Sequence, residues 1–321
     1  MLPSIRTEYR RVDGMSQRRS FDRLNPGDFL RSFAVSSVKK VVPSRLKPRL
    51  KRVLPINFAW KRHDPPVWPL PENVDKNGLE RYAYSLFSQN GEDGILRYLF
   101  GQIGFASRQF LEFGFDGTEN NSLRLILVES FSGVFIDGSE LCVSQFNKAA
   151  RASGILNTKA VRAFLTLDNL ESTIRSSGLP SDIDLLSIDV DGNDYWFWSA
   201  LTCVRPRIVV IEYNASMGPD RSVTVPYDAT FNRIEKHAST FYHGASLAAL
   251  EKLGRQKGYS LTGCDERGVN AFFVRTDCLC EGIPVTSALI AYRPHKSRLE
   301  RGYSVEDQFG AIASMPFVEI E

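Results

Sequence analysis

Four acidic residues gather in the stretch "DLLSIDVDGNDYWFW", residues 184–198: Asp184, Asp189, Asp191 and Asp194. The first precedes the core of a predicted strand, and we expect it at the surface. The other three follow the strand, where ionised carboxylates this close repel one another unless a substrate cation, a divalent metal ion or water compensates their charge. Carboxylate oxygens are the ligands that Mg²⁺ and Ca²⁺ prefer. Asp189 and Asp191, together with Glu212 further along the chain, are therefore candidate metal ligands.

Acidic residues also mark the ends of the other predicted strands. Short apolar runs typical of buried strands cover residues 108–114, 132–139, 156–166, 183–192 and 206–214. At or after their carboxyl ends lie Glu112, Asp137, Asp168, Asp189 and Glu212. Ligands of open α/β sheets bind outside the carboxyl ends of the strands. A single acid there is more often a loop or capping residue, but five in succession favour a binding site.

Helical segments separate these strands. Apolar residues recur at helical spacing in residues 91–104, 119–130, 140–154, 167–178, 194–201 and 246–258. This alternation indicates a mostly parallel sheet with helices on both faces. Residues 259–277 contain two short apolar runs joined by a turn, which predicts an antiparallel hairpin. We predict an α/β, doubly wound Rossmann-type domain over residues 79–285, preceded by a basic arm and Pro-rich linker at 1–78 and followed by a C-terminal extension at 286–321.

The stretch "LEFGFDGTENN" suits a cationic ligand better than a phosphate. Gly114 and Gly117 let the backbone turn sharply and approach a ligand. A dinucleotide-binding loop would read G-x-G-x-x-G, but here Asp116 takes the position of the central glycine. Glu112 would repel a phosphate and could pair with an ammonium group. S-adenosylmethionine carries such a group and has no phosphate.

Two further acids fit an adenosyl ligand without identifying it. Asp137, at the end of the second strand, could accept hydrogen bonds from both hydroxyls of a ribose, which dinucleotides also contain. Asp168 follows the third strand, where it could bind an adenine amino group. The same segment, "LDNLEST", also reads as a helix cap, so both interpretations stay open there.

The order of these motifs resembles the FkbM-like group of S-adenosylmethionine-dependent methyltransferases. The resemblance covers about Tyr84 to Asp277. It rests on six blocks: "SQNGEDGIL", "FLEFGFDGTENNS", "GVFIDGS", "DLLSIDVDGNDYWFWSAL", "IVVIEYN", and "YHGASLAALEKLGRQKGYSL" with "GVNAFFVR". It implies a sheet that ends in an antiparallel strand, the cofactor S-adenosylmethionine, and a sugar or glycan acceptor. The implied cofactor-binding residues are Ser88, Gln89, Glu112, Gly114, Gly117, Asn121, Asp137, Asp168 and Asp189. The Phe115–Asp116 pair between the two glycines departs from the usual methyltransferase loop.

Two catalytic schemes fit methyl transfer to a hydroxyl. In-line transfer depends chiefly on proximity, but a weakly acidic hydroxyl benefits from a base or a metal. His243, in "FYHGAS", could remove the proton. Alternatively, Asp189 and Asp191, with Glu212, could hold a divalent ion such as Mg²⁺. A nicotinamide-dependent oxidoreductase and a non-catalytic binding protein on the same fold are the competing functions.

Composition restricts the setting of the protein. The 321 residues contain no apolar run of membrane-spanning length and no signal-peptide pattern, and the five cysteines form no CxxC pair. We therefore expect a cytoplasmic protein. Residues 1–62 hold 16 basic and 4 acidic residues, whereas the rest holds 24 and 33. The arm, which mixes apolar and basic residues, predicts peripheral contact with acidic membrane on its inner face. The net acidic body does not favour nucleic acid as a partner.

Overall fold

The computed structural model describes residues 78–115 and 119–321. The described residues belong to one compact unit. The predicted basic arm therefore lies outside the described residues. Within the described part of the chain, no helix has both the length and the apolar character needed to cross a bilayer.

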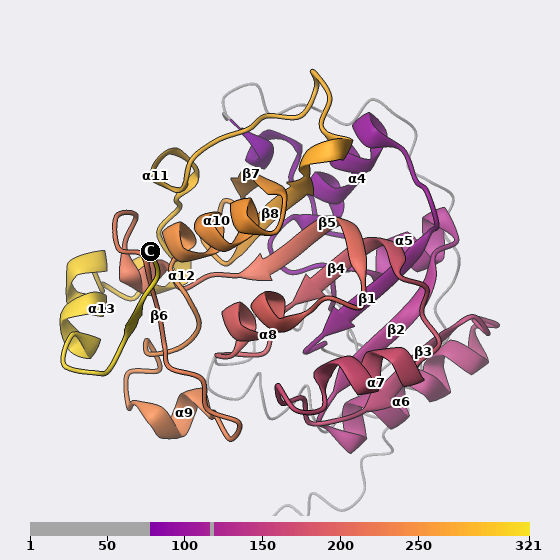
Figure 1. Cartoon of the computed structure of the whole chain (residues 1–321), viewed down its shortest axis with the longest axis horizontal. Helices are drawn as coiled ribbons and strands as arrows, with labels where there is room; N and C mark the ends of the chain where they lie inside the picture. The colour runs from indigo at the N-terminus through magenta and orange to yellow at the C-terminus, as the bar shows by residue number, and fades with distance from the viewer. Residues whose placement is uncertain (1–77, 116–118) are drawn as a thin grey trace, which may run out of the picture. The chain divides into compact units, whose positions relative to one another are not determined.

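A seven-stranded sheet forms the centre of the fold, in the order β3-β2-β1-β4-β5-β8-β7 (Figure 1). Its strands are β1 (Gln109–Phe113), β2 (Ser132–Asp137), β3 (Thr158–Arg162), β4 (Asp182–Ile188), β5 (Arg205–Glu212), β7 (Tyr259–Cys264) and β8 (Asn270–Arg275). The first five are parallel, and β8 runs antiparallel to both β5 and β7. Five parallel strands followed by this hairpin form the Rossmann-like fold of class I methyltransferases, which confirms the fold predicted from the sequence.

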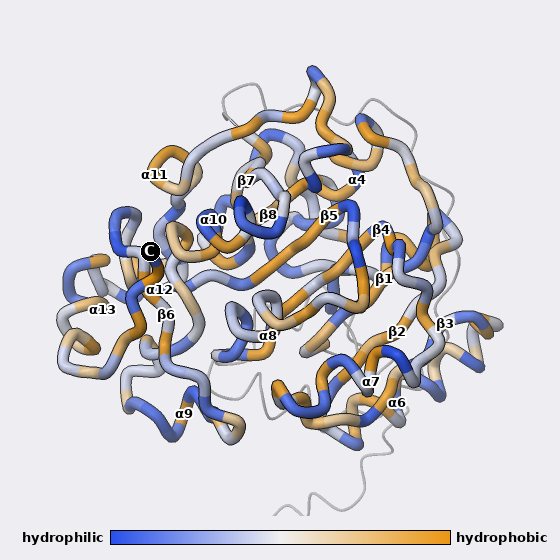
Figure 2. The backbone as a smooth tube through the Cα atoms, in the orientation of Figure 1, coloured by the Kyte–Doolittle hydropathy of each residue, from blue (hydrophilic) through white to orange (hydrophobic). Residues whose placement is uncertain are grey.

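Helices cover both faces of the sheet because the strand side chains alternate between two hydrophobic clusters. The first cluster includes α7 (Leu170–Ser176), α8 (Asp194–Ala200) and α10 (Leu247–Gln256). The second includes α4 (Glu92–Ile103), α5 (Leu123–Glu129) and α6 (Glu140–Ala152). On β1, for example, Leu111 packs into the first cluster and Phe110 into the second. Figure 2 shows hydrophobic colours along the central strands β4 and β5 and a hydrophilic stretch at α9.

Two segments lie beyond the carboxyl ends of β4 and β5 (Figure 1). The insertion after β5 contains the 3-10 helix η3 (Ala215–Met217), β6 (Val223–Thr224) and α9 (Arg233–Lys236). The C-terminal segment contains α11 (Ala288–Ala291), α12 (Lys296–Leu299), α13 (Val305–Ile312) and β9 (Val318–Glu319), which pairs with β6. The remaining short elements are η2 (Leu79–Tyr82) and η4 (Thr276–Cys278).

Asp184 is not a surface residue, contrary to the expectation from the sequence. Its side chain is fully buried near the amino end of β4. It accepts hydrogen bonds from the backbone N–H groups of Ala106 and Ser107, at 3.0 Å each, and of Arg108 at 2.6 Å. The Arg207 guanidinium lies 3.5 Å away. These donors compensate the buried charge, so Asp184 stabilises the entry to β1. It lies at the amino ends of the parallel strands, opposite the carboxyl ends where the candidate site lies.

Candidate functional site

The first loop of the candidate site passes directly over the end of β4. Gly114 has a φ of 69°, and a Cβ atom at this position would lie 1.6 Å from the carbonyl oxygen of Asp189. The N–H of Gly114 donates to the Ile136 carbonyl at 3.1 Å, and the N–H of Asp189 donates to the Phe113 carbonyl at 3.2 Å. Only glycine fits both this conformation and this contact. The ends of β1, β2 and β4 are thereby held together.

Glu112 lies beside this crossing and is 3% exposed. Its Oε1 atom accepts a hydrogen bond from the N–H of Asn121 at 3.0 Å, and the Asn121 side chain donates to Ser187 Oγ on β4 at 3.0 Å. Burial raises the pKa of Glu112 to about 7, although the hydrogen bond from the Asn121 N–H opposes the shift. A bound cation would favour its ionised form. Glu112 and Asn121 therefore lie together, as a cofactor-binding role requires.

The segment with Ser88 and Gln89 lies next to these residues, because the N–H of Asn120 donates to the Phe87 carbonyl at 3.1 Å. Ser88 exchanges two hydrogen bonds with Asp93: its N–H donates to Oδ2 at 2.9 Å, and its Oγ accepts from the Asp93 N–H at 3.0 Å. Gln89 is exposed. Ser88 thus holds the loop in shape, and Gln89 is the residue free to reach a ligand. The predicted cofactor residue Gly117 lies outside the described residues.

The ends of β2 and β3 form the neighbouring part of the rim. Asp137 is half-buried and accepts a hydrogen bond from the N–H of Ser139 at 2.6 Å. Phe164, which sequence analysis did not single out, is 62% exposed and lies against Gly138, where a Cβ atom would be 3.2 Å from its ring. Asp168 is exposed beyond it. An open aromatic face therefore lies beside the predicted ribose-binding acid.

Asn169 determines the shape of the loop that carries Asp168. Its side chain accepts from the N–H of Thr166 at 2.8 Å and donates to the Phe164 carbonyl at 3.0 Å. It is the residue before α7, but its side chain does not cap that helix. No side-chain hydrogen bond from Asn169 caps α7, so the structure does not support the capping interpretation of this segment. The role of Asp168 in binding adenine stays a prediction.

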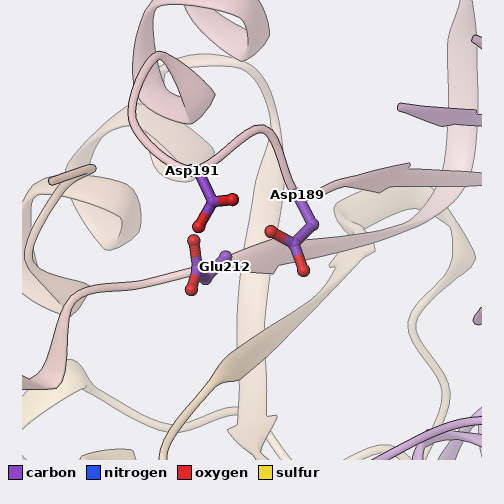
Figure 3. Close-up of side chains that lie close together, drawn as sticks. All are labelled: Asp189, Asp191 and Glu212. Atoms are coloured by element: carbon purple, nitrogen blue, oxygen red, sulfur yellow. The ribbon is translucent and has the colours of Figure 1, made fainter. Parts of the chain in front are cut away.

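Three carboxylates converge beyond β4 and β5. One oxygen from each of Asp189, Asp191 and Glu212 lies within 4.8 Å of the others (Figure 3). Arg233, in the insertion, places Nη1 2.8 Å from Asp191 Oδ1 and 3.7 Å from Glu212 Oε1. Asp191 itself has a φ of 59°, a conformation that few non-glycine residues adopt. A protein guanidinium thus supplies the compensating charge that the sequence analysis assigned to a substrate, a metal or water.

Crowding and burial raise the pKa values of these acids. Burial, followed by the charges of Glu212 and Asp191, raises the pKa of Asp189 well above its usual range. Burial raises the pKa of Glu212 to about 8, against the opposing effect of Arg233. Burial lowers the pKa of Arg233, but the charges of Glu212 and Asp191 outweigh this effect and raise it. Carboxylates whose pKa values are raised in this way, here Asp189 and Glu212, can accept a proton near neutral pH.

Asp194, the fourth acid of the opening stretch, holds the turn. It is fully buried and accepts hydrogen bonds from the N–H groups of Val190 and Gly192, at 2.9 Å each. Burial raises its pKa to about 6. Gly192 leaves room for the Phe231 ring, which would be 2.2 Å from a Cβ atom there. Asp194 therefore shapes the loop that presents Asp189 and Asp191.

His243 lies behind Glu212 and is 1% exposed. Its Nδ1 atom is 3.7 Å from Glu212 Oε2, and its Nε2 atom is 3.0 Å from Nη2 of Arg298, a residue of α12. Burial and the charges of Arg233 and Arg298 hold the pKa of His243 well below its usual range. The structure therefore brings His243 to the acid cluster but encloses both ring nitrogens. Its role as a base stays a prediction.

The carboxylate set is chemically suited to a divalent ion, since all three donors are oxygens. The Arg233 guanidinium, however, bridges two of the three acids. An ion bound by Asp189, Asp191 and Glu212 would have to displace it. Metal binding is thus open to these residues, but their charge is already compensated in this arrangement.

Sequence reasoning missed Arg233 and Arg298, because both come from segments without the strand-and-helix periodicity that identified the others. Arg233 follows Asn232, whose side chain accepts from the N–H of Ile234 at 3.0 Å and caps α9. The sequence "FNRIEK" could have predicted that short helix. No comparable signal marks Arg298.

Comparison with known proteins does not assign the chain to a family. No protein-family model and no curated protein matches the sequence. Among solved structures, the N-terminal domain of EvdMO1 with SAH bound is 12% identical, with a TM-score of 0.36 over 59% of this chain and 81% of that chain. An O-methyltransferase from Bacillus cereus in complex with SAH is 16% identical, with a TM-score of 0.36 over 56% and 79%. The Methanococcus jannaschii fibrillarin pre-rRNA processing protein is 10% identical, with a TM-score of 0.36 over 58% and 76%.

Identities and TM-scores of this size do not carry the role of any of these proteins over to this chain. The resemblance to the FkbM-like group therefore stays a prediction.

Proposed function

We propose that this chain is an S-adenosylmethionine-dependent methyltransferase that methylates a hydroxyl of a sugar or another small acceptor. The observation that supports this proposal best is the buried Glu112 beside the point where Gly114 contacts the Asp189 carbonyl. There the carboxylate would meet a cationic group. A nucleotide phosphate would instead be repelled. Asp137 with Phe164 supports an adenosyl group at the next strand end.

The acceptor hydroxyl would lie over the acid cluster. Asp189 is half-buried and so more accessible than Glu212 or His243, and its backbone touches the first loop at Gly114. We assign Asp189 the role of accepting the hydroxyl proton as the oxygen attacks the sulfonium methyl group. The methyl–sulfur bond breaks as the new carbon–oxygen bond forms, and S-adenosylhomocysteine leaves. Phe231, half-buried against Gly192, provides an aromatic wall on which the apolar face of a sugar can pack.

Calorimetry of the full chain tests the class of enzyme. S-adenosylmethionine and S-adenosylhomocysteine should bind, and NAD should not. Glu112→Gln should weaken binding of both by about tenfold, a loss of about 1.4 kcal/mol, whereas substitution of the exposed Glu281 should have no effect. Binding of NAD alone would favour the oxidoreductase, and binding of none of the three would favour a non-catalytic protein.

Methyl transfer from labelled S-adenosylmethionine to a panel of monosaccharides and sugar nucleotides tests the acceptor class. With an acceptor in hand, Asp189→Asn should lower kcat by about 100-fold, within the usual range for loss of a general base, and leave cofactor affinity within about threefold. The exposed Asp220→Asn is the matched control. Unchanged turnover in Asp189→Asn would remove Asp189 from this role.

No step of this proposal needs a metal ion. Because Arg233 already pairs with Asp191 and lies near Glu212, dialysis against a chelator should leave cofactor binding and methyl transfer unchanged. Loss of activity that Mg²⁺ restores would instead favour the metal scheme with Asp189, Asp191 and Glu212 as ligands.

A further inference from the structure

A buried polar chain connects the C-terminal segment to the acid cluster. Arg298 is 4% exposed, and its Nη1 atom donates to Asn214 Oδ1 at 3.2 Å, while Nη2 lies 3.0 Å from His243 Nε2. The other nitrogen of the same ring, Nδ1, lies 3.7 Å from Glu212 Oε2. Arg298, His243 and Glu212 therefore form a line of contacts that ends at the site.

Donor and acceptor chemistry determines where the proton of this imidazole lies. A guanidinium has only N–H donors, so the Nε2 atom facing Arg298 has to be the acceptor. A neutral ring whose Nε2 accepts carries its proton on Nδ1. Nδ1 of His243 and Oε2 of Glu212 are both buried, and neither has a hydrogen-bond partner among the described residues. They lie 3.7 Å apart, and Oε2 is the acceptor that faces Nδ1. The ring N–H therefore faces the carboxylate of Glu212.

We propose that Arg298 is a positioning residue, which fixes the Nδ1–H tautomer of His243 and thereby directs one N–H at Oε2 of Glu212. Glu212 then keeps Oε1 on the side of Arg233 and Asp191. Outer groups that fix the tautomer and orientation of an inner one are a common feature of active sites. The catalytic value of this arrangement rests on the proposed function, but the tautomer is a property of the free protein.

Nuclear magnetic resonance of the full chain with ¹⁵N-labelled histidine tests the proposal directly. Long-range ¹⁵N–¹H correlations distinguish the two tautomers, and loss of one set of signals in His243→Gln assigns this ring among the four histidines. Wild-type protein should show Nδ1–H. Glu212→Gln should retain it, because a glutamine amide accommodates either tautomer and Arg298 still requires Nε2 to accept.

Removal of the guanidinium should release the tautomer. Glu212→Gln combined with Arg298→Met should shift the ring to a form with Nε2–H, whereas Glu212→Gln with Arg298→Lys, which keeps an N–H donor, should retain Nδ1–H. Arg301→Met, an exposed change on the same segment, is the matched control and should retain it too.

Wild-type protein with Nε2–H, or a shift to Nε2–H in Glu212→Gln alone, would overturn the proposal, since Arg298 would then not set the tautomer. If the double variant with methionine fails to fold, the wild-type and Glu212→Gln spectra still decide. Calorimetry with S-adenosylmethionine on the same samples separates the two proposals, because absence of binding would remove the methyltransferase function and leave the tautomer result standing.

Discussion

Phe164 is an exposed aromatic residue at the rim of the candidate site. The residue is 62% exposed, follows β3, and packs against Gly138, the neighbour of Asp137. Stacking of a base on an aromatic side chain contributes about 1–3 kcal/mol. We therefore expect Phe164→Ala to weaken binding of S-adenosylmethionine by about tenfold or more in calorimetry, with an unchanged melting temperature.

Leu156→Ala is the matched control for Phe164, because this residue is also a large apolar side chain on the surface, 84% exposed, and lies before β3 rather than after it. It should leave the affinity unchanged. Equal affinities of wild type and Phe164→Ala would place the adenine elsewhere and remove Phe164 from the predicted cofactor site.

Glu112 should also give the folding equilibrium a measurable pH dependence. Its pKa is about 7 in the folded protein, raised by burial from 4.5. A raised folded-state pKa means that the contribution of the group to stability is complete below the unfolded value and is lost as pH rises through the folded one. We expect the free energy of unfolding, measured in urea without cofactor, to fall between about pH 5 and pH 7.

Glu112→Gln should flatten part of that fall, because the amide does not titrate. Asp194, Asp265 and Glu212, whose pKa values burial raises to about 6, about 7 and about 8, should leave a residual slope. The exposed Glu281→Gln should follow the wild-type curve. A Glu112→Gln curve that coincides with the wild type between pH 5 and pH 7 would contradict the assignment of the raised pKa to Glu112.

At the scale of elements, the C-terminal segment completes the site. Gln308, on α13, accepts a hydrogen bond from Ser216 Oγ at 2.8 Å, and both are fully buried. Ile312 is also fully buried and packs with Met217. Sequence analysis described residues 286–321 as an extension to the domain, yet these contacts reach the segment that follows β5.

A chain that ends at residue 285 should therefore be strongly destabilised. Asn214, Ser216 and His243 would lose buried partners, at about 1–3 kcal/mol for each unsatisfied group. We expect a fall in melting temperature of more than about 10 °C, or no soluble protein. Gln308→Ala should give an intermediate fall and the exposed Glu300→Ala none. A truncated chain that melts with the full one would show that the segment is dispensable.

The sequence could predict features that depend on local patterns of residues, but not contacts between residues far apart in the chain. The acids at strand ends were predictable, because a strand's periodicity is local and its carboxyl end is where parallel strands present side chains. Contacts such as Arg233 with Asp191 or Arg298 with His243 join residues 42 and 55 positions apart. They depend on how irregular segments pack, and no local pattern encodes that. The prediction that Asp184 lies at the surface was wrong for the same reason, because three backbone N–H groups from residues 106–108 enclose it.

At the scale of the whole molecule, charge is divided unevenly along the chain. Residues 1–62 carry a net charge of +12 and the remainder −9. Each basic residue near an acidic lipid surface contributes about 1 kcal/mol of attraction, whereas the acidic body should be repelled. We therefore propose that the arm, and not the catalytic domain, attaches the protein to acidic membranes.

Deletion of residues 1–62 should then separate two properties of the protein. Sedimentation with vesicles that contain phosphatidylserine should fall to the level seen with neutral vesicles, because the remaining chain is net negative. Affinity for S-adenosylmethionine should not change, since the predicted cofactor residues all lie between Ser88 and Asp189. Attachment of the full chain should weaken as salt rises, because screening shortens the reach of the attraction to about 8 Å at physiological ionic strength. Equal sedimentation with and without the arm would exclude it as the membrane-binding element, and salt-independent attachment would point to apolar insertion instead.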